Sequence, residues 1–231
     1  MQRLKVVITE PIHVAGLDML AEATDLLYLP DSPNTPLGDV VPEASALGVR
    51  LARITPELMD CAPGLKVIAK HGVGVDNIDV QAATQRGVVV VYTPKANAVS
   101  VAEHIVSLML GLANRICAAN ADLRSGAFRR REDYVGVELS GKTLGIVGLG
   151  RIGRETARIC GAGFSMEVIA YDPILAPEAI EEAGCQDAGT LADLLLASDF
   201  VALCVPLNDK THGMIGSKEL ASMKSMAFLV N

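Results

Sequence analysis

A glycine-rich segment, GLGRIG at residues 148–153, constrains the fold of this 231-residue chain more than any other feature. An apolar run at 143–147 precedes it and a helical pattern follows, so the three glycines stand at a strand-to-helix turn. In such a turn, Gly148 allows the sharp bend, Gly150 lets an anion approach the backbone, and Gly153 lets the helix pack closely on the strand. The free N–H groups at the helix N-terminus then face the anion. The segment therefore predicts a binding site for the pyrophosphate of a dinucleotide.

An acidic residue after the next strand indicates which dinucleotide is bound. Asp172 follows the apolar run 167–171 and lies 19 residues after Gly153, where a ribose-binding carboxylate is expected. Such a carboxylate accepts a hydrogen bond from the ribose 2′-OH but repels a 2′-phosphate, by roughly 4 kcal/mol before screening. The next residues, Pro173 and two aliphatic side chains, supply no cation. The sequence therefore predicts NAD in preference to NADP.

Short β-branched runs alternate with helical patterns along the chain, which is typical of an α/β fold with parallel sheets. Before residue 98 the patterns predict strands at 4–8, 26–29, 46–49, 65–69 and 88–91, and helices at 16–23, 56–61 and 79–86. After residue 141 they predict strands at 143–147, 168–171, 200–205 and 227–230, and helices at 151–162, 177–183, 191–197 and 217–223. We therefore expect two α/β domains, at 1–98 and 99–231.

Three connecting segments carry their own patterns. The stretch Pro30–Pro42 contains four prolines and is predicted to be an extended connection. Residues 99–119 are predicted to form one long interdomain helix, in which Ser100 and Glu103 have the spacing of a capping box. The Arg-rich stretch 122–133 is predicted to be a loop or arm.

Composition excludes several classes of partner. The chain has 20 Lys and Arg against 27 Asp and Glu, a net charge of −7, with one basic run at 129–131 and only 3% aromatic residues. This balance argues against nucleic-acid binding, which needs clustered positive charge. The five cysteines include no C-x-x-C pair, so we expect neither a disulfide framework nor a metal site, and a cytoplasmic location. The N-terminal apolar run is too short for a signal peptide, and no window of 18 apolar residues predicts a membrane span.

Five blocks together resemble the D-isomer-specific 2-hydroxyacid dehydrogenases, and within them the phosphoglycerate dehydrogenase-like branch. In family order they are KHGVGVDNID at 70–79, TPKANAVSVAEH at 93–104, ELSGKTLGIVGLGRIG at 138–153, CVPLNDKT at 204–211 and MKSMAFLVN at 223–231. The first 65 residues match the family only loosely. The resemblance implies a flavodoxin-like substrate lobe at 1–98, a Rossmann NAD-binding lobe at 99–231, and a cleft between them where a D-2-hydroxy acid and its 2-keto acid interconvert.

The resemblance also implies roles for individual residues. Those implied to contact the cofactor are Val73, Gly148, Gly150, Arg151, Ile152, Gly153, Asp172, Pro173, Cys204, Val205, Pro206 and Thr211. Those implied to contact the substrate are Arg50, Lys70, His71, Gly72, Val73, Gly74 and Asn97. Independently of the resemblance, residues 72–74 suit a backbone nest for a carboxylate, although a simple turn capped by Asp76 or Asp79 has the same sequence signature. Lys70 and Arg50 suit a second anionic group, as in 3-phosphoglycerate, and equally suit solvated strand ends.

The sequence departs from the family in its catalytic residues. The family's Arg, Glu and His would follow the strand at 228–231, and the given sequence ends at Asn231. Of the histidines His13, His71, His104 and His212, only His71 flanks the nest, and no internal set replaces the three residues. We therefore expect a fragment of an NAD-dependent dehydrogenase that is inactive alone, with no catalytic residue inside the chain and an exposed strand edge at 228–231.

Two alternatives and one assembly remain as hypotheses. The chain could be a non-catalytic NAD-binding or sensing module of the same fold. It could also belong to another enzyme with a similar cofactor lobe, such as adenosylhomocysteinase or a formate dehydrogenase, but the nucleoside-binding insertions of the former are not found. Residues 99–137 resemble the family's dimer contact, which implies a homodimer.

Overall fold

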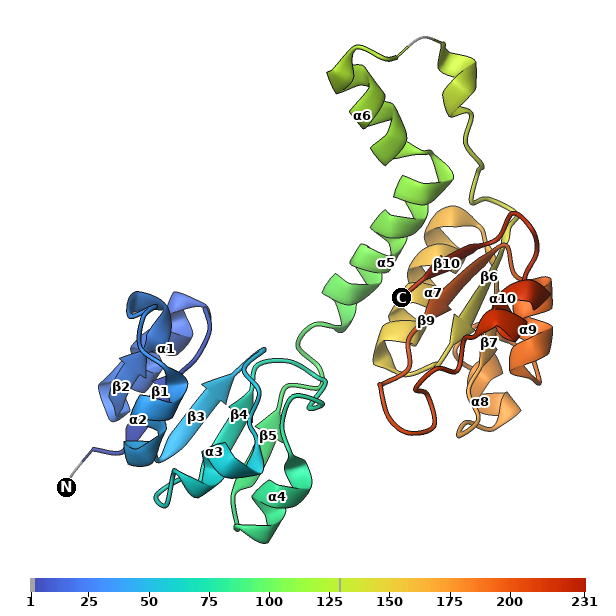
Figure 1. Cartoon of the computed structure of the whole chain (residues 1–231). Coiled ribbons are helices and arrows are strands. Elements are labelled where there is room, and N and C mark those ends of the chain that lie inside the picture. The colour runs from blue at the N-terminus through green and yellow to red at the C-terminus, as the bar shows by residue number, and fades with distance from the viewer. Residues whose placement is uncertain (1–2, 129) are drawn as a thin grey trace. The chain divides into compact units, whose positions relative to one another are not determined.

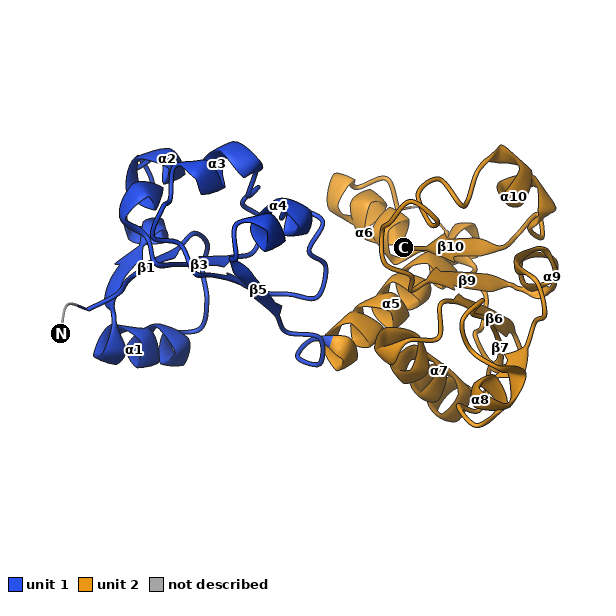
Figure 2. Cartoon of the chain, turned by 90° about the horizontal axis from the view of Figure 1, so that it is seen from below, with its two compact units in different colours: residues 1–97 blue, residues 98–231 orange. Residues whose placement is uncertain are grey.

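The computed structural model describes residues 3–128 and 130–231, and it divides into two compact units, residues 1–97 and 98–231 (Figures 1 and 2). Arg129, the first residue of the basic run at 129–131, lies outside the described residues, as do Met1 and Gln2. Each unit contains its own parallel sheet and its own apolar core. The predicted α/β fold with parallel sheets is therefore confirmed.

The sheet of the first unit has the strand order β2-β1-β3-β4-β5, with every neighbouring pair parallel. Its strands are β1 (Lys5–Ile8), β2 (Asp25–Tyr28), β3 (Ala46–Val49), β4 (Val67–Lys70) and β5 (Val89–Tyr92). This order is that of flavodoxin-like folds, in which the chain changes direction across the sheet between β1 and β3. The carboxyl ends of β1, β3 and β4 consequently lie side by side at one edge.

Helices cover both faces of this sheet. They are α1 (Val14–Ala23), α2 (Leu37–Val40), α3 (Pro56–Asp60) and α4 (Val80–Gln85), with 3-10 turns η1 (Leu29–Asp31) and η2 (Val41–Glu43). Figure 2 shows α1 on one face and α2, α3 and α4 on the other. Val7, Leu47, Val49 and Ile68 project from the strands toward the second group and form the buried core there. Burial of these aliphatic side chains supplies the main drive for folding.

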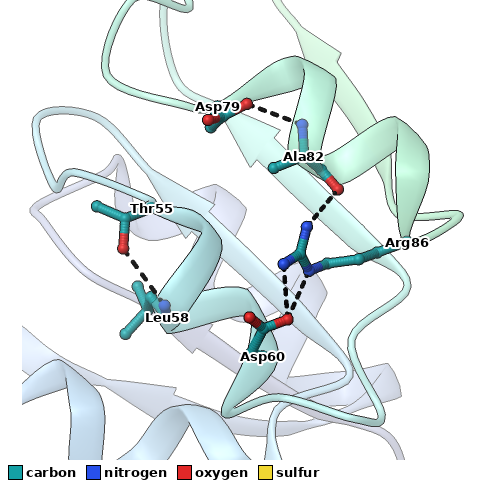
Figure 3. Close-up of polar contacts among 6 residues, drawn as sticks. All are labelled: Thr55, Leu58, Asp60, Asp79, Ala82 and Arg86. Atoms are coloured by element: carbon teal, nitrogen blue, oxygen red, sulfur yellow. Dashed lines mark hydrogen bonds and ion pairs between the residues drawn. The ribbon is translucent and has the colours of Figure 1, made fainter.

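Polar side chains fix α3 and α4 against each other (Figure 3). Thr55 Oγ1 accepts the N–H of Leu58 at 3.3 Å and caps α3, and Asp79 Oδ1 accepts the N–H of Ala82 at 2.8 Å and caps α4. Arg86 joins the two helices, because its Nη1 donates to the carbonyl of Ala82 at 3.0 Å while its Nε donates to Asp60 Oδ1 at 2.8 Å. Asp79 is therefore a helix cap, as one reading of the glycine loop allowed.

The sheet of the second unit has the order β10-β9-β6-β7-β8, again all parallel. Its strands are β6 (Thr143–Val147), β7 (Glu167–Tyr171), β8 (Gln186–Asp187), β9 (Phe200–Leu203) and β10 (Phe228–Val230). Strand order reverses between β6 and β9, as in dinucleotide-binding folds. The two-residue strand β8 was missed in the sequence, because Gln186 and Asp187 have no apolar pattern.

Two helical layers enclose the second sheet. Its helices are α5 (Ala98–Ala113), α6 (Ile116–Ser125), α7 (Arg151–Phe164), α8 (Pro177–Glu181), α9 (Leu191–Ala197) and α10 (Ser217–Ser222), with a 3-10 turn η3 (Arg131–Tyr134). Met109 of α5 and Cys160 of α7 pack with Ile146 of the sheet in one core, whereas Leu194 of α9 packs with Val147 in another. Alternation along β6 thus buries both faces of that strand, as expected for a central parallel strand.

The prediction of one helix over residues 99–119 is wrong. The helix breaks after Ala113, and Arg115 adopts a left-handed conformation with φ of 54°, so α5 and α6 meet at a 60° bend. The N–H of Val137, which lies outside the helix, donates to the carbonyl of Ala113 at 2.9 Å and caps the C-terminus of α5. The expected capping box is wrong as well, because α5 already begins at Ala98 and Ser100 lies inside it.

Two predicted loops also contain helix. Within Pro30–Pro42 the structure forms α2 and parts of two 3-10 turns, because Pro30, Pro36 and Pro42 stand at helix starts, where a missing N–H costs nothing. Within 122–133, α6 continues to Ser125 and η3 begins at Arg131. Among the described residues no single helix is long and apolar enough to cross a membrane; α5 and α6 meet that length and composition only as a bent pair.

Candidate functional site

Three loops of the second unit converge at the carboxyl edge of its sheet. Val147, the last residue of β6, pairs with Tyr171 of β7 and with Leu203 of β9, so the three strands end level. The residues that follow, Gly148, Asp172 and Cys204, therefore lie together where the strand order reverses. This is the position at which open α/β sheets bind ligands.

The three glycines of the loop are required for different reasons. Gly148 has φ of +90°, and Gly153 is so close to the strand that a Cβ would lie 2.3 Å from the carbonyl oxygen of Gly148. A Cβ at Gly150, by contrast, would meet no heavy atom within 4 Å. Gly150 is the N-cap of α7, and the N–H of Ile152 has no acceptor among the residues that the structure describes. Open space in front of free helix N–H groups fits a pyrophosphate.

Asp172 is held beside this loop by two backbone groups. Its Oδ2 accepts the N–H of Leu149 at 2.9 Å, and its Oδ1 accepts the N–H of Ile174 at 3.0 Å. Each oxygen of an ionised carboxylate can accept a further hydrogen bond, so ribose hydroxyls can still bind there. Asp172 therefore both orders the glycine loop and presents acceptors at its rim.

The residues predicted on the adenine side form a second rim. Pro173 follows Asp172, whereas Cys204, Val205 and Pro206 follow β9. Thr211 returns to this segment, because its Oγ1 donates to the carbonyl of Pro206 and accepts the N–H of Asn208. Burial raises the pKa of the Cys204 thiol to about 12, so this thiol stays protonated at neutral pH. The protonated Cys204 thiol is therefore a weak nucleophile at neutral pH.

The glycine loop of the first unit offers fewer free N–H groups than the sequence suggested. It follows β4, and the N–H of Gly72 is already used, since it donates to Thr93 Oγ1 at 3.1 Å and lies 3.1 Å from the carbonyl oxygen of Lys70. The N–H groups of Val73 and Gly74 have no acceptor within residues 3–128 and 130–231. Of the three N–H groups expected in the nest at residues 72–74, only those of Val73 and Gly74 are therefore available to a ligand.

The two cations near this loop differ in their surroundings. The Lys70 ammonium donates to the carbonyl of Arg50 at 2.6 Å and to Asn77 Oδ1, so it is not a solvated strand end. The Arg50 side chain follows β3, is exposed, and has no polar partner in the described part of the chain. Of the two, Arg50 is the cation that remains available to a ligand.

The remaining predicted substrate residues lie on the same unit. His71 is exposed and its backbone N–H donates to the carbonyl of Val49 at 2.8 Å. Asn97 carries a buried side-chain oxygen that has no hydrogen-bond partner among the described residues. Such an acceptor is rare in folded proteins unless a donor arrives from elsewhere.

His13 lines the same pocket of the first unit as Arg50 and His71, and its Nδ1 accepts the N–H of Ala15 at 3.2 Å and caps α1. His104 and His212 are exposed on α5 and on a loop. No group of three His, Cys, Asp or Glu side chains suited to a metal ion occurs among the residues that the structure describes.

Comparison with known proteins identifies the family. Residues 106–231 match the family model described as "D-isomer specific 2-hydroxyacid dehydrogenase, NAD binding domain". The glyoxylate reductase of Thermococcus litoralis is 40% identical over 98% of this chain and 71% of its own length. The chain belongs to the D-isomer-specific 2-hydroxyacid dehydrogenase family. Its second unit therefore contains the NAD-binding domain of that family, and the predicted cofactor is confirmed.

Other family members differ from this chain in length. D-3-phosphoglycerate dehydrogenase of Methanocaldococcus jannaschii is 39% identical over 99% of this chain, but the match spans only 43% of that enzyme. The crystal structure of D-lactate dehydrogenase from Aquifex aeolicus, complexed with NAD and lactic acid, matches 97% of this chain and 67% of its own with a TM-score of 0.83 and 30% identity. The chain thus spans less than half of the phosphoglycerate dehydrogenases that it resembles.

Two polar residues of the first unit were missed in the sequence. The Glu10 carboxylate accepts the N–H groups of Arg50, Leu51 and Ala52 at 2.7, 2.8 and 2.5 Å, and Asn77 receives the Lys70 ammonium. Partial burial raises the pKa of Glu10, but hydrogen bonds from the Thr9 hydroxyl and from the N–H groups of residues 50–52 outweigh it and hold this pKa below its usual value. The signal for Glu10 was its place two residues after the end of β1, at the edge where ligands bind.

Proposed function

We propose that this chain supplies the NAD-binding unit, and part of the substrate-binding unit, of an enzyme that interconverts a D-2-hydroxy acid and its 2-keto acid. The open space at Gly150, in front of the first turn of α7 and beside Asp172, carries the proposal. Bound NAD supplies the hydride acceptor of such a reaction. The residues of this chain bind and orient both molecules.

On the cofactor side, each proposed contact follows from an available group. Gly150 leaves room for the pyrophosphate, and the N–H of Ile152 donates to it; Gly148, Arg151 and Gly153 complete the turn. Asp172 accepts from the adenosine ribose and disfavours a 2′-phosphate. The rim formed by Pro173, Cys204, Val205, Pro206 and Thr211 lies against the adenine.

On the substrate side, the free N–H groups of Val73 and Gly74 bind the substrate carboxylate. The exposed Arg50 guanidinium binds a second anionic group, which favours a substrate that resembles 3-phosphoglycerate. His71 and Asn97 lie near the substrate, and Val73 also meets the nicotinamide end of NAD. Proton transfer to the keto oxygen needs a donor that this chain's four histidines do not supply, so we expect no turnover by these 231 residues alone.

Calorimetric titration of the 231-residue chain with NAD and NADP tests this proposal. We expect NAD to bind and NADP to bind much more weakly; equal affinity for the two, or no binding of NAD, would contradict it. Turnover of glyoxylate, pyruvate and 3-phosphohydroxypyruvate with NADH is then measured on a longer version of the chain. Tight NAD binding without turnover in the longer version would favour the non-catalytic NAD-binding module instead.

The proposed location is the cytoplasm, which suits the five free cysteines.

The proposed assembly is a homodimer through residues 99–137. Leu112, Ile116 and Leu123 are exposed apolar side chains along α5 and α6, which supports a contact there. Sedimentation velocity of Leu123→Glu should show a monomer. Leu196→Glu is the matched control, because Leu196 on α9 is 65% exposed and Leu123 is 66% exposed. Equal sedimentation of the two variants would refute the contact.

A further inference from the structure

Two loops at the carboxyl edge of the first sheet are joined by polar side chains that the proposed function leaves unused. The first loop, residues 50–54, follows β3, and the second, residues 71–77, follows β4. Because β3 and β4 are neighbours in the sheet and Val49 pairs with Lys70, the loops leave the sheet side by side. The second loop contains the free N–H groups of Val73 and Gly74.

Lys70 connects the two loops. Its ammonium donates to the carbonyl of Arg50 in the first loop at 2.6 Å and to Asn77 Oδ1 in the second. Its stem lies beside Gly72, since a Cβ at this glycine would meet Lys70 Cε at 3.4 Å. One charged group thus fixes the start of the first loop to the end of the second.

Asn77 and Glu10 complete the connection. Asn77 Nδ2 donates to the backbone carbonyl of Ala52 at 2.6 Å, and the backbone carbonyl of Asn77 accepts the N–H of Ile54 at 2.8 Å. The Glu10 carboxylate holds the first loop from the other side through the N–H groups of residues 50–52. Those three N–H groups are consequently closed to any ligand anion, whereas Val73 and Gly74 remain open.

We propose that Lys70 is a positioning residue that, with Glu10 and Asn77, holds the loop 71–77 in the shape that exposes the N–H groups of Val73 and Gly74 to a carboxylate. This inference rests on the proposed function for the identity of the ligand. It assigns the two cations different roles, because Arg50 meets the substrate directly whereas Lys70 acts through the loop. Loop N–H groups bind a carboxylate well only when neighbouring contacts hold them in one orientation.

Amide hydrogen exchange on the 231-residue chain tests the connection itself. Lys70→Met keeps the aliphatic stem and removes the ammonium. We expect the hydrogen-bonded N–H groups of residues 50–52, 54, 71 and 72 to exchange about tenfold faster, while those of β1 and β6 are unchanged. Lys66→Met is the matched control, because Lys66 is an exposed lysine immediately before the opposite end of the same strand. Equal exchange in the two variants would overturn the proposal.

Titration with oxamate, followed by the amide resonances of residues 72–74, tests the consequence for binding. We expect Lys70→Met to bind oxamate at least fivefold more weakly, Lys70→Arg to restore most of the affinity, and Lys66→Met to match the unmodified chain. Unchanged oxamate affinity in a folded Lys70→Met variant would overturn the positioning role. If the unmodified chain shows no shift at Val73 and Gly74, the proposed carboxylate site fails, while the exchange measurement still decides whether Lys70 joins the loops.

Discussion

Replacing Gly150 with valine should weaken NAD binding strongly and leave the fold intact. A Cβ at this position meets nothing within 4 Å, and the φ of −71° suits any L-residue. The isopropyl group therefore extends into the space in front of α7 that the pyrophosphate would occupy. Losing the charge-assisted hydrogen bond from the N–H of Ile152 costs about 1.5–3 kcal/mol. We expect NAD affinity to fall by about 10–150-fold.

Two other glycines make this prediction specific. Gly163 lies in the same helix with open space around it, so Gly163→Ala should bind NAD normally and gain about 0.5–1 kcal/mol of stability. Gly153→Ala would place a Cβ 2.3 Å from the carbonyl oxygen of Gly148, so it should lose about 1–3 kcal/mol of stability. Calorimetry with NAD and urea unfolding measure both quantities on each variant. Normal NAD binding by folded Gly150→Val, or full stability of Gly153→Ala, would refute the reasoning.

Four further changes have defined expectations. Asp172→Ser should weaken NAD binding and narrow its advantage over NADP in calorimetry, because the repelling carboxylate is removed. Arg86→Met should lower the free energy of unfolding by about 0.5–1.5 kcal/mol in urea, since it loses Asp60 and a helix carbonyl. Ser165→Gly should raise the melting temperature, because this exposed residue ends α7 at φ of 54°, where glycine is unstrained. The raised pKa of Cys204 means that the folded state favours the neutral thiol, so the contribution of this thiol to stability is present below about pH 9 and is lost toward pH 12. Iodoacetamide should therefore not modify Cys204 in the native protein at pH 8.

The elements that the sequence predicted well are those whose cause is local. The central strands of both sheets are short apolar runs because parallel strands are buried on both faces. The glycine loop at 148–153 was identified because each of its glycines answers a separate steric demand within a few residues. The position of Asp172 directly after β7 follows from its distance along the chain, because the length of a βαβ unit fixes where its second strand ends.

The features that were missed depend on partners far along the chain. The apolar pattern of residues 99–119 is continuous, yet α5 ends because the N–H of Val137 caps Ala113 from 24 residues away, a contact that periodicity does not reveal. Lys70 was assigned to substrate because it ends a strand at the ligand edge. Its actual acceptors come from Arg50, 20 residues earlier, and from Asn77. Local spacing therefore left the role of Lys70 open.

In both units, some loop N–H groups are occupied by protein acceptors and others have none among the described residues. In the first unit, Glu10 occupies the N–H groups of residues 50–52 and Thr93 that of Gly72, which leaves Val73 and Gly74. In the second, Asp172 occupies the N–H of Leu149, and that of Ile152 remains. An acidic or hydroxyl side chain of the protein thus satisfies one part of each loop and holds the rest open. The N–H groups left without a protein acceptor at the carboxyl edge are therefore those that can donate to an anion.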